Sequence, residues 1–102
     1  MNRVFKALSD PTRRRVLQLL RQGPLSAGEL SEHFAVTKPT MSAHFSVLQE
    51  AGLIEAEKTG RTVLYRLKMS VLEDALLGFV DTLGSRKRAR SERRARPVKE
   101  NA

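Results

Sequence analysis

Two helix starts that follow each other closely limit the possible folds of this chain more than any other feature. Ser26 and Glu29 have the S-x-x-E spacing of a capping box, in which each side chain satisfies a free N–H group at the start of the helix. Thr37 can cap a second helix, and Pro39 is tolerated in its first turn because the amides there have no intrahelical acceptor. Only residues 35–37 separate the two predicted helices. Two helices joined by a short turn are typical of a helix-turn-helix.

The second of these helices carries a narrow apolar stripe. Met41, Phe45 and Leu48 recur at the spacing i, i+4, i+7, which places them on one side of a helix. Two strand patterns follow, over residues 53–57 and 62–67, on either side of the loop KTGR. The sequence therefore predicts a β-hairpin directly after the two helices.

Further helices are predicted on both sides of this motif. A short apolar stripe within residues 4–8 predicts a first helix. Asp10 and Pro11 are typical of a helix N-cap and first turn, and they predict a second helix. Ser70 and Glu73 repeat the capping-box spacing and open a last helix. The predicted fold is mainly α with a small β-hairpin (α+β): a winged helix-turn-helix in the order ααααββα.

Positive charge is concentrated near the C-terminal end. The 102 residues carry a net charge of +8, and eight Lys or Arg against two Glu lie after Ser85. We therefore expect one winged helix-turn-helix domain over residues 1–85 and a basic, disordered tail over residues 86–102. Such a tail fits non-specific binding to nucleic acid as well as a solubilising end.

Several classes of protein are excluded by what the sequence lacks. It has no cysteine, which excludes disulfides, thiolate metal sites and thiol nucleophiles. No segment resembles a signal peptide or a membrane span, which predicts a cytoplasmic protein without membrane insertion. There is no glycine-rich phosphate loop, activated nucleophile or carboxylate pair, so we expect no enzyme activity and no cofactor. His33 and His44 lie on different predicted helices without partners at ligand spacing, so no metal site is expected.

The second helix of a helix-turn-helix lies in the DNA major groove and needs a rim of short or polar side chains. No carboxylate occurs between Glu32 and Glu50 in this chain, and one there would repel phosphates. An ordinary exposed amphipathic helix has the same polar face, but the neighbouring capped helix and hairpin favour DNA reading. His44 fits a structural contact as well as a DNA contact. The candidate DNA-binding residues of this helix are Thr37, Lys38, Pro39, Thr40, Ser42, Ala43 and His44.

The hairpin is predicted to act as the wing, with Lys58, Thr59, Gly60 and Arg61 as candidate DNA contacts. Arg61 is the best candidate for the minor groove or its phosphates. For Arg66 and Lys68 we favour a solvated role.

Arg13, Arg14 and Arg15 fall in the first turn of a predicted helix, where the macrodipole disfavours cations. We expect at least one of them to pair with a carboxylate, and another to approach the DNA backbone.

The last helix has more apolar surface than packing on a small domain requires, which indicates a partner. Together with the first helix it could form a homodimer interface, although burial of the same residues in the core is the alternative. The candidate interface residues are Val4, Phe5, Leu8, Leu72, Leu76, Phe79, Val80 and Leu83.

The segments FKALSDPTRRRVLQLL, LSAGELSEHF, TKPTMSAHFSVLQEAGLI and GRTVLYRL resemble the ArsR-type winged-helix transcriptional repressors, and more narrowly their SdpR-like autorepressor branch. The resemblance implies a homodimeric repressor that binds an imperfectly palindromic operator and dimerises through its first and last helices. It implies DNA reading by Thr37, Lys38, Thr40, Ser42 and His44, and a wing contact by Arg61. Metal-sensing members carry cysteines in the helix that here reads AGELSEHF, or histidine and acidic ligands in the last helix. Because this sequence has no cysteine, it departs from the metal-sensing members of the family.

Three functions follow from these patterns. The first is a homodimeric transcriptional repressor that binds specific sequences of double-stranded DNA. It could repress its own gene, and an unidentified protein or small molecule could act as its inducer. The second is a non-specific architectural protein that binds nucleic acid through its basic tail. The third is a protein-interaction module that keeps the winged-helix shape without the DNA function.

Overall fold

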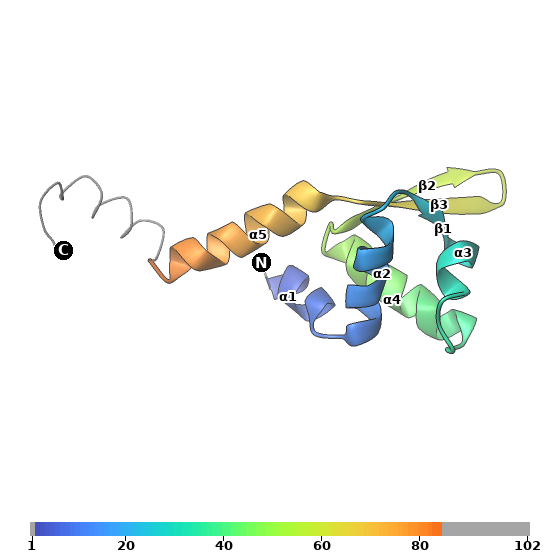
Figure 1. The fold of residues 1–102 in the computed structure, drawn as a ribbon, viewed down its shortest axis with the longest axis horizontal. Coiled ribbons are helices and arrows are strands. Elements are labelled where there is room, and N and C mark those ends of the chain that lie inside the picture. The colour runs from blue at the N-terminus through green and yellow to red at the C-terminus, as the bar shows by residue number, and fades with distance from the viewer. Residues whose placement is uncertain (1, 85–102) are drawn as a thin grey trace, which may run out of the picture. The chain divides into compact units, whose positions relative to one another are not determined.

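The computed structural model describes residues 2–84, and the predicted tail over residues 86–102 lies outside the described residues. Residues up to Leu72 form one compact unit, and the rest of the last helix is described by itself. In chain order the elements are α1 (Asn2–Leu8), α2 (Pro11–Leu20), β1 (Leu25–Ser26), α3 (Ala27–Ser31), α4 (Lys38–Glu50), β2 (Ile54–Thr59), β3 (Thr62–Leu67) and α5 (Met69–Thr82) (Figure 1). This order confirms the predicted winged helix-turn-helix and adds one short strand.

The added strand, β1, turns the predicted hairpin into a three-stranded antiparallel sheet in the order β1-β3-β2. Leu25 pairs with Tyr65 and Ser26 with Leu64. A strand of two residues shows no alternation along the sequence, so only its pairing with β3 identifies it. This pairing joins the start of α3 to the base of the hairpin.

The hairpin loop is shorter than the sequence predicted. Thr59 pairs with Thr62, so Lys58 and Thr59 belong to β2 and the loop between the strands is Gly60 and Arg61. Gly60 has a φ of 61°, a left-handed conformation that glycine adopts without strain. The short loop keeps the two strands paired up to the tip of the wing.

The apolar stripe predicted for α4, the second helix of the helix-turn-helix, lies in the core. Met41, Phe45 and Leu48 of α4 are buried, together with Leu30 of α3. The ring of Phe45 packs against Tyr65 of β3, with ring centroids 4.7 Å apart. One face of α4 is thus fixed to the sheet, and its remaining surface is left for other contacts.

Three of the predicted helix caps are confirmed. Oδ2 of Asp10 accepts a hydrogen bond from the main-chain N–H of Arg13 at 3.1 Å. In the capping box at the start of α3, the Ser26 hydroxyl accepts from the N–H of Glu29 at 3.0 Å, and the N–H of Ser26 donates to Oε1 of Glu29 at 2.8 Å. Thr37 caps α4 with a 3.3 Å bond from the N–H of Thr40 to its hydroxyl oxygen. Local sequence therefore determines where α2, α3 and α4 begin.

Two predicted boundaries were wrong. The helix α3 ends at Ser31, whose hydroxyl donates to the carbonyl of Ala27 at 2.8 Å, so Phe34 lies beyond the helix and the turn before α4 is longer than three residues. The helix α5 begins at Met69, which places Ser70 inside the helix rather than at its N-cap. The N–H of Val71 donates instead to the main-chain carbonyl of Lys68 at 3.1 Å.

The end of α4 directs the chain into the wing. Gly52 has a φ of 75°, and its N–H donates to the carbonyl of Gln49 at 2.9 Å. The N–H of Leu53 donates to the carbonyl of Leu48 at 3.0 Å, which completes a Schellman motif. Because β2 starts at the next residue, Ile54, this turn fixes where the hairpin leaves α4.

Candidate nucleic-acid interface

The predicted rim of α4 is exposed, with one exception. The exposed side chains at the start of this helix are those of Thr37, Lys38, Pro39, Thr40, Ser42 and Ala43. They lie on the surface that the buried stripe leaves free, and none carries a negative charge. A helix held down along one side, with short neutral or cationic side chains on the other, can approach DNA closely.

A hydrogen bond between two hydroxyl groups at the start of α4 determines which of them can donate to a partner. The hydroxyl of Thr37 donates to the hydroxyl oxygen of Thr40 at 2.9 Å while accepting from the N–H of Thr40. The Thr40 hydroxyl is therefore an acceptor toward Thr37, which leaves its own proton to donate outward. Phosphate oxygens and the acceptor atoms of base edges are suitable partners for such a proton.

His44 is the exception, because the structure places it in an intramolecular network. Its side chain is only 16% exposed, and its Nε2 lies 3.9 Å from Oδ2 of Asp10. Its Nδ1 lies 3.1 Å from Nη1 of Arg13. A guanidinium group only donates, so Nδ1 must accept, which places the imidazole proton on Nε2. Of the two roles that the sequence left open, this geometry supports the structural contact.

The arginines in the first turn of α2 bind main-chain carbonyls. Arg13 donates from Nε to the carbonyl of Ala7 at 2.8 Å and from Nη2 to that of Lys6 at 2.9 Å. Arg14 donates from Nη1 to the carbonyl of Leu8 at 2.7 Å. Both guanidinium groups therefore cap the C-terminus of α1, where a positive charge is favourable.

Among residues 2–84 none of these arginines forms the expected ion pair with a carboxylate, and Arg15 also binds a neutral group, Oε1 of Gln18, at 2.9 Å. The sequence argument considered the dipole of the helix that carries the arginines. It missed the C-terminus of the preceding helix, which lies within their reach.

The carboxyl of Asp10 completes the network around His44. Burial alone would raise its pKa, but hydrogen bonds from the N–H groups of Arg13 and Thr12 and the positive charge of Arg13 lower it below 3.8 overall. A carboxyl with a depressed pKa stabilises the fold above its ordinary titration range, and this contribution is lost as the pH falls below about 4. At neutral pH the N-cap of α2 is thus an anion.

Ion pairs occupy two of the basic residues of the wing. Arg66 lies 3.1 Å from Glu57, and Lys68 lies 3.4 Å from Glu55. Arg61 takes part in neither pair and is exposed. Both pairs are exposed, which agrees with the solvated role favoured for Arg66 and Lys68. The positive charge that these pairs leave on the wing lies toward its tip, at Arg61.

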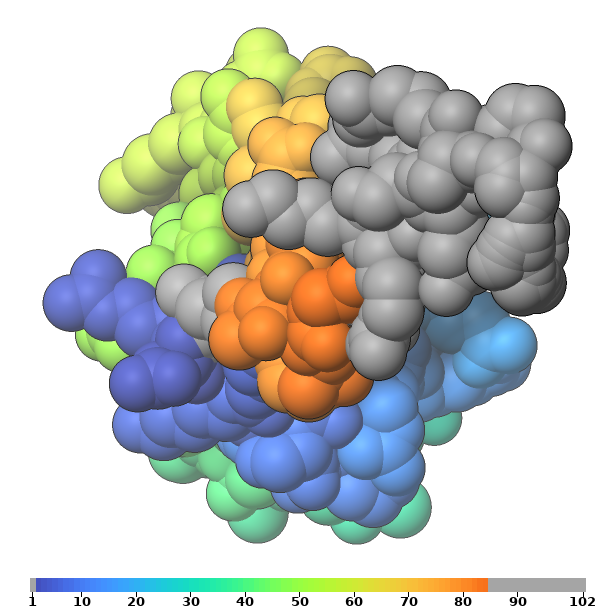
Figure 2. Space-filling model, turned by 90° about the vertical axis from the view of Figure 1, so that its left-hand side faces the viewer, coloured from blue at the N-terminus to red at the C-terminus, as the bar shows by residue number. Residues whose placement is uncertain are grey.

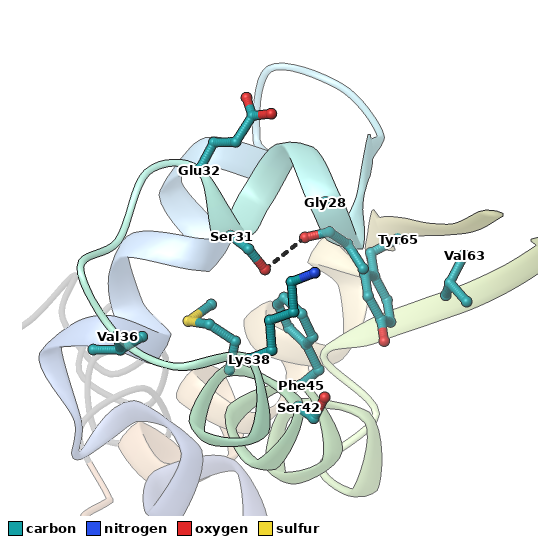
Figure 3. Close-up of a pocket in the computed structure, with 11 residues that line it drawn as sticks. Gly28, Ser31, Glu32, Val36, Lys38, Ser42, Phe45, Val63 and Tyr65 are labelled. Atoms are coloured by element: carbon teal, nitrogen blue, oxygen red, sulfur yellow. Dashed lines mark hydrogen bonds between the residues drawn. The ribbon is translucent and has the colours of Figure 1, made fainter. Parts of the chain in front are cut away.

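A groove of about 670 Å³ lies between α3, α4 and β3 (Figure 3). Phe45 and Tyr65 contribute to its apolar side, and burial raises the pKa of the Tyr65 hydroxyl, which therefore stays protonated at neutral pH. The Lys38 side chain extends from the start of α4 toward β3, and the Ser42 hydroxyl lies at the edge of the groove (Figure 3). Glu32, directly after α3, also lines the groove, with its carboxylate turned outward from it (Figure 3). The side of the groove next to α4 thus presents one ammonium group and one hydroxyl.

The candidate dimer residues fall into two groups. Val4 is only 5% exposed and packs in the core of the single chain, which agrees with the alternative of core burial at this position. Phe5 and Leu8 of α1 are half-buried, and α1 lies beside α2 on the face that Figure 2 shows.

The α5 residues of the candidate interface are more accessible. No residue of α5 is buried in the single chain. Leu76 is 42% and Phe79 43% exposed, while Leu72 and Val80 are half-buried, and Leu83, in the turn directly after the helix, is 61% exposed. A helix of 14 residues with this much accessible apolar surface is typical of an element that packs against another chain.

No three His, Cys, Asp or Glu side chains among residues 2–84 come close enough together to hold a metal ion. None of the described helices is both long and apolar enough to cross a membrane.

Comparison with known proteins identifies the family. A model of a helix-turn-helix domain matches residues 8–57. The transcriptional repressor SdpR of Bacillus subtilis is 45% identical over 84 residues, which cover 79% of this chain and 93% of SdpR. The crystal structure of an ArsR family transcriptional regulator has a TM-score of 0.76 and 29% identity, and covers 84% of this chain and 94% of that one.

A homodimeric winged helix-turn-helix DNA-binding domain from Mycobacterium bovis, described as a possible ArsR-family regulator, has a TM-score of 0.64 and 29% identity, covering 82% of this chain and 77% of that one. These proteins are regulators of transcription, and their helix-turn-helix domain is not that of an enzyme family. The sequence, the fold and these similarities agree: the chain belongs to the ArsR family of winged helix-turn-helix transcriptional repressors.

Proposed function

We propose that this protein is a homodimeric repressor that binds an imperfectly palindromic operator, including DNA upstream of its own gene, without sensing a metal. The observation that carries the proposal is the division of α4 into a buried apolar stripe and an exposed rim without carboxylates. The resemblance to SdpR, a transcriptional repressor, supports it.

In this proposal the first half of α4 enters the major groove. Thr37, Lys38, Pro39, Thr40, Ser42 and Ala43 form the surface that faces the DNA. Lys38 can bind a guanine edge or a phosphate, and the outward proton of Thr40 can be donated to either kind of acceptor. His44 is left out of this set because its ring is bonded to Arg13.

The wing and the groove beside it fit the DNA backbone. If α4 occupies the major groove and the Gly60-Arg61 tip approaches the adjacent minor groove, the intervening phosphates pass over the space between α4 and β3. Lys38 lies at one edge of that space. Lys58 is exposed on β2, directly opposite Val63, which lines the same groove. Both ammonium groups are therefore suited to phosphate contacts.

Dimerisation is proposed to involve α5 and the exposed parts of α1. Leu72, Leu76 and Phe79 recur at i, i+4 and i+7, which places them along one side of α5, and Leu83 continues the same spacing in the turn directly after the helix. The homodimeric domain from Mycobacterium bovis supports a two-fold assembly. A two-fold dimer places its recognition helices roughly 34–36 Å apart, one turn of DNA, which is why a palindromic operator is expected.

Release from DNA is proposed to depend on a partner protein or a small molecule rather than on a metal or another cofactor. The sequence has no cysteine, and residues 2–84 contain no cluster of metal ligands, which supports this view. A transcriptional regulator acts on the chromosome. In bacteria such as those that carry the named relatives, the chromosome lies in the cytoplasm.

The test is a comparison of DNA affinities. The full chain is titrated, at physiological salt, into labelled DNA from the region upstream of its gene and into random DNA of equal length, and binding is followed by fluorescence anisotropy. A specific repressor should bind the upstream DNA about 10³-fold more tightly or better. Equal affinities for both DNAs would contradict autorepression. If the two affinities are equal and binding is lost when residues 86–102 are deleted, the protein is instead an architectural protein that binds nucleic acid through its tail.

Replacing Arg61 with alanine should weaken operator binding roughly tenfold, because an unpaired cation at the wing tip is removed from the DNA backbone. The slope of log affinity against log salt should fall by about 1. Arg66→Ala is the matched control, since it removes the same charge from a residue that is paired with Glu57. Equal effects of the two substitutions would show that only net charge matters, and would remove the wing tip from the interface.

A further inference from the structure

Arg13 connects three helices through a single guanidinium group. Its Nε and Nη2 donate to the carbonyls of Ala7 and Lys6, in the last turn of α1. Its Nη1 contacts Nδ1 of His44 on α4 at 3.1 Å. Its own main-chain N–H is bound by Asp10, the N-cap of α2. All three nitrogens of the side chain therefore have partners, and the side chain is half-buried.

This contact reaches α4 at His44, a half-buried position beside the apolar stripe. Met41, Phe45 and Leu48 fix which face of α4 is buried, and the packing of Phe45 on Tyr65 ties the helix to β3. His44 adds a directional bond toward α1 and α2, both of which pack against α4. His44 is the middle residue of α4 and directly follows the rim. Groups that bind a partner have to be held to within about 0.5 Å, so such a bond influences recognition directly.

We infer that Arg13 is a positioning residue for DNA recognition: by joining the C-terminus of α1 to His44, it holds the rim of α4 in the geometry that the operator requires, without touching DNA itself. This inference rests on the proposed repressor function. It applies to arginine in particular, because the planar guanidinium donates in three fixed directions and a lysine ammonium cannot reproduce that geometry.

Arg14 provides a matched control from the same turn. It also caps α1, by donating to the carbonyl of Leu8, and this bond does not involve α4. Arg13→Lys and Arg14→Lys both retain charge and both weaken the capping of α1. Only the first removes the link to His44.

Two substitutions of His44 separate the link from the imidazole ring. Asparagine places a side-chain oxygen near the position of Nδ1 and can still accept from Arg13, whereas leucine cannot. His44→Asn should therefore bind the operator within about twofold of the wild type. His44→Leu and Arg13→Lys should each bind about tenfold more weakly, a difference of about 1.4 kcal/mol.

The experiment measures the affinity of the full chain for the upstream DNA, and the thermal unfolding midpoint, for the wild type, the four single variants and Arg13→Lys/His44→Leu. The inference predicts that the double variant binds no more weakly than either single variant, because both remove one contact. It also predicts that Arg14→Lys lowers the midpoint without weakening binding. Additive losses in the double variant, equal weakening by Arg14→Lys, or failure of His44→Asn to bind better than His44→Leu would overturn the inference.

A readout without DNA keeps this inference distinguishable from the proposed function. Amide hydrogen exchange in the first half of α4 should be about tenfold faster in Arg13→Lys than in Arg14→Lys, because only the former frees α4 from α1. If the wild type does not discriminate upstream from random DNA, the proposed function fails while faster exchange still supports the positioning role. If exchange in α4 is equal in the two variants, the positioning role fails whatever the DNA result.

Discussion

Thr40→Glu is expected to abolish operator binding while leaving the thermal stability of the protein unchanged or slightly higher. Thr40 is the third residue of α4, and its N–H already donates to the N-cap Thr37. A glutamate at this position completes a capping box and places a negative charge at the positive end of the helix dipole. The chain already contains such a box at Ser26 and Glu29. The substitution should therefore do no harm to folding.

Its effect on DNA binding should be large, because the carboxylate would face phosphates from the centre of the rim. We expect a loss of about 100-fold or more, or about 2.7 kcal/mol, measured by fluorescence anisotropy beside thermal unfolding followed by circular dichroism. Thr40→Gln is the matched control: it has the same shape and capping capacity without the charge, and it should lose much less. If Thr40→Glu binds as tightly as the wild type, α4 does not read DNA, and a protein-interaction module becomes the better interpretation of the fold.

Leu76→Glu is expected to convert the proposed dimer to a monomer. Leu76 is 42% exposed in the single chain and lies in the centre of the α5 stripe, so a glutamate there would be buried without a partner in the dimer. We expect dimer dissociation to become about 100-fold more favourable, which light scattering after size-exclusion chromatography can detect at micromolar concentration. Operator affinity should fall with it, since one chain can occupy only one half-site.

Leu77→Glu is the control for this experiment. Leu77 is 47% exposed, and as the next residue along the helix it points about 100° away from Leu76. It should leave the oligomeric state unchanged. If the two variants dissociate equally, or if neither does, the stripe from Leu72 to Leu83 is not the dimer interface.

The parts of the fold that the sequence predicts are those determined by local signals. Asp10, Ser26 and Thr37 cap the helices they were expected to cap. Met41, Phe45 and Leu48 are buried as their spacing required. Such signals depend on residues three to seven apart, so a single sequence contains all the information they need.

The features that were missed depend on residues distant in the sequence. Arg13 and His44 are 31 positions apart, and no local pattern indicates that their side chains meet. The strand β1 exists because Leu25 pairs with Tyr65. The ends of α3 and of the hairpin loop were misplaced for a related reason, since backbone pairing and side-chain bonds override the residue preferences there. Candidate residues on α4 could thus be listed from sequence, but the separation of His44 from the rim required the structure.

The division within α4 also bears on how new DNA specificities arise. Side chains such as Lys38, Ser42 and Ala43 are exposed, and surface substitutions of this kind change the free energy of unfolding by about 0.5 kcal/mol or less. After gene duplication, one copy could exchange them and acquire a different target site before its folding is affected. The same property makes α4 suitable for engineering regulators with chosen target sites, provided that Thr37, His44 and the buried stripe are kept.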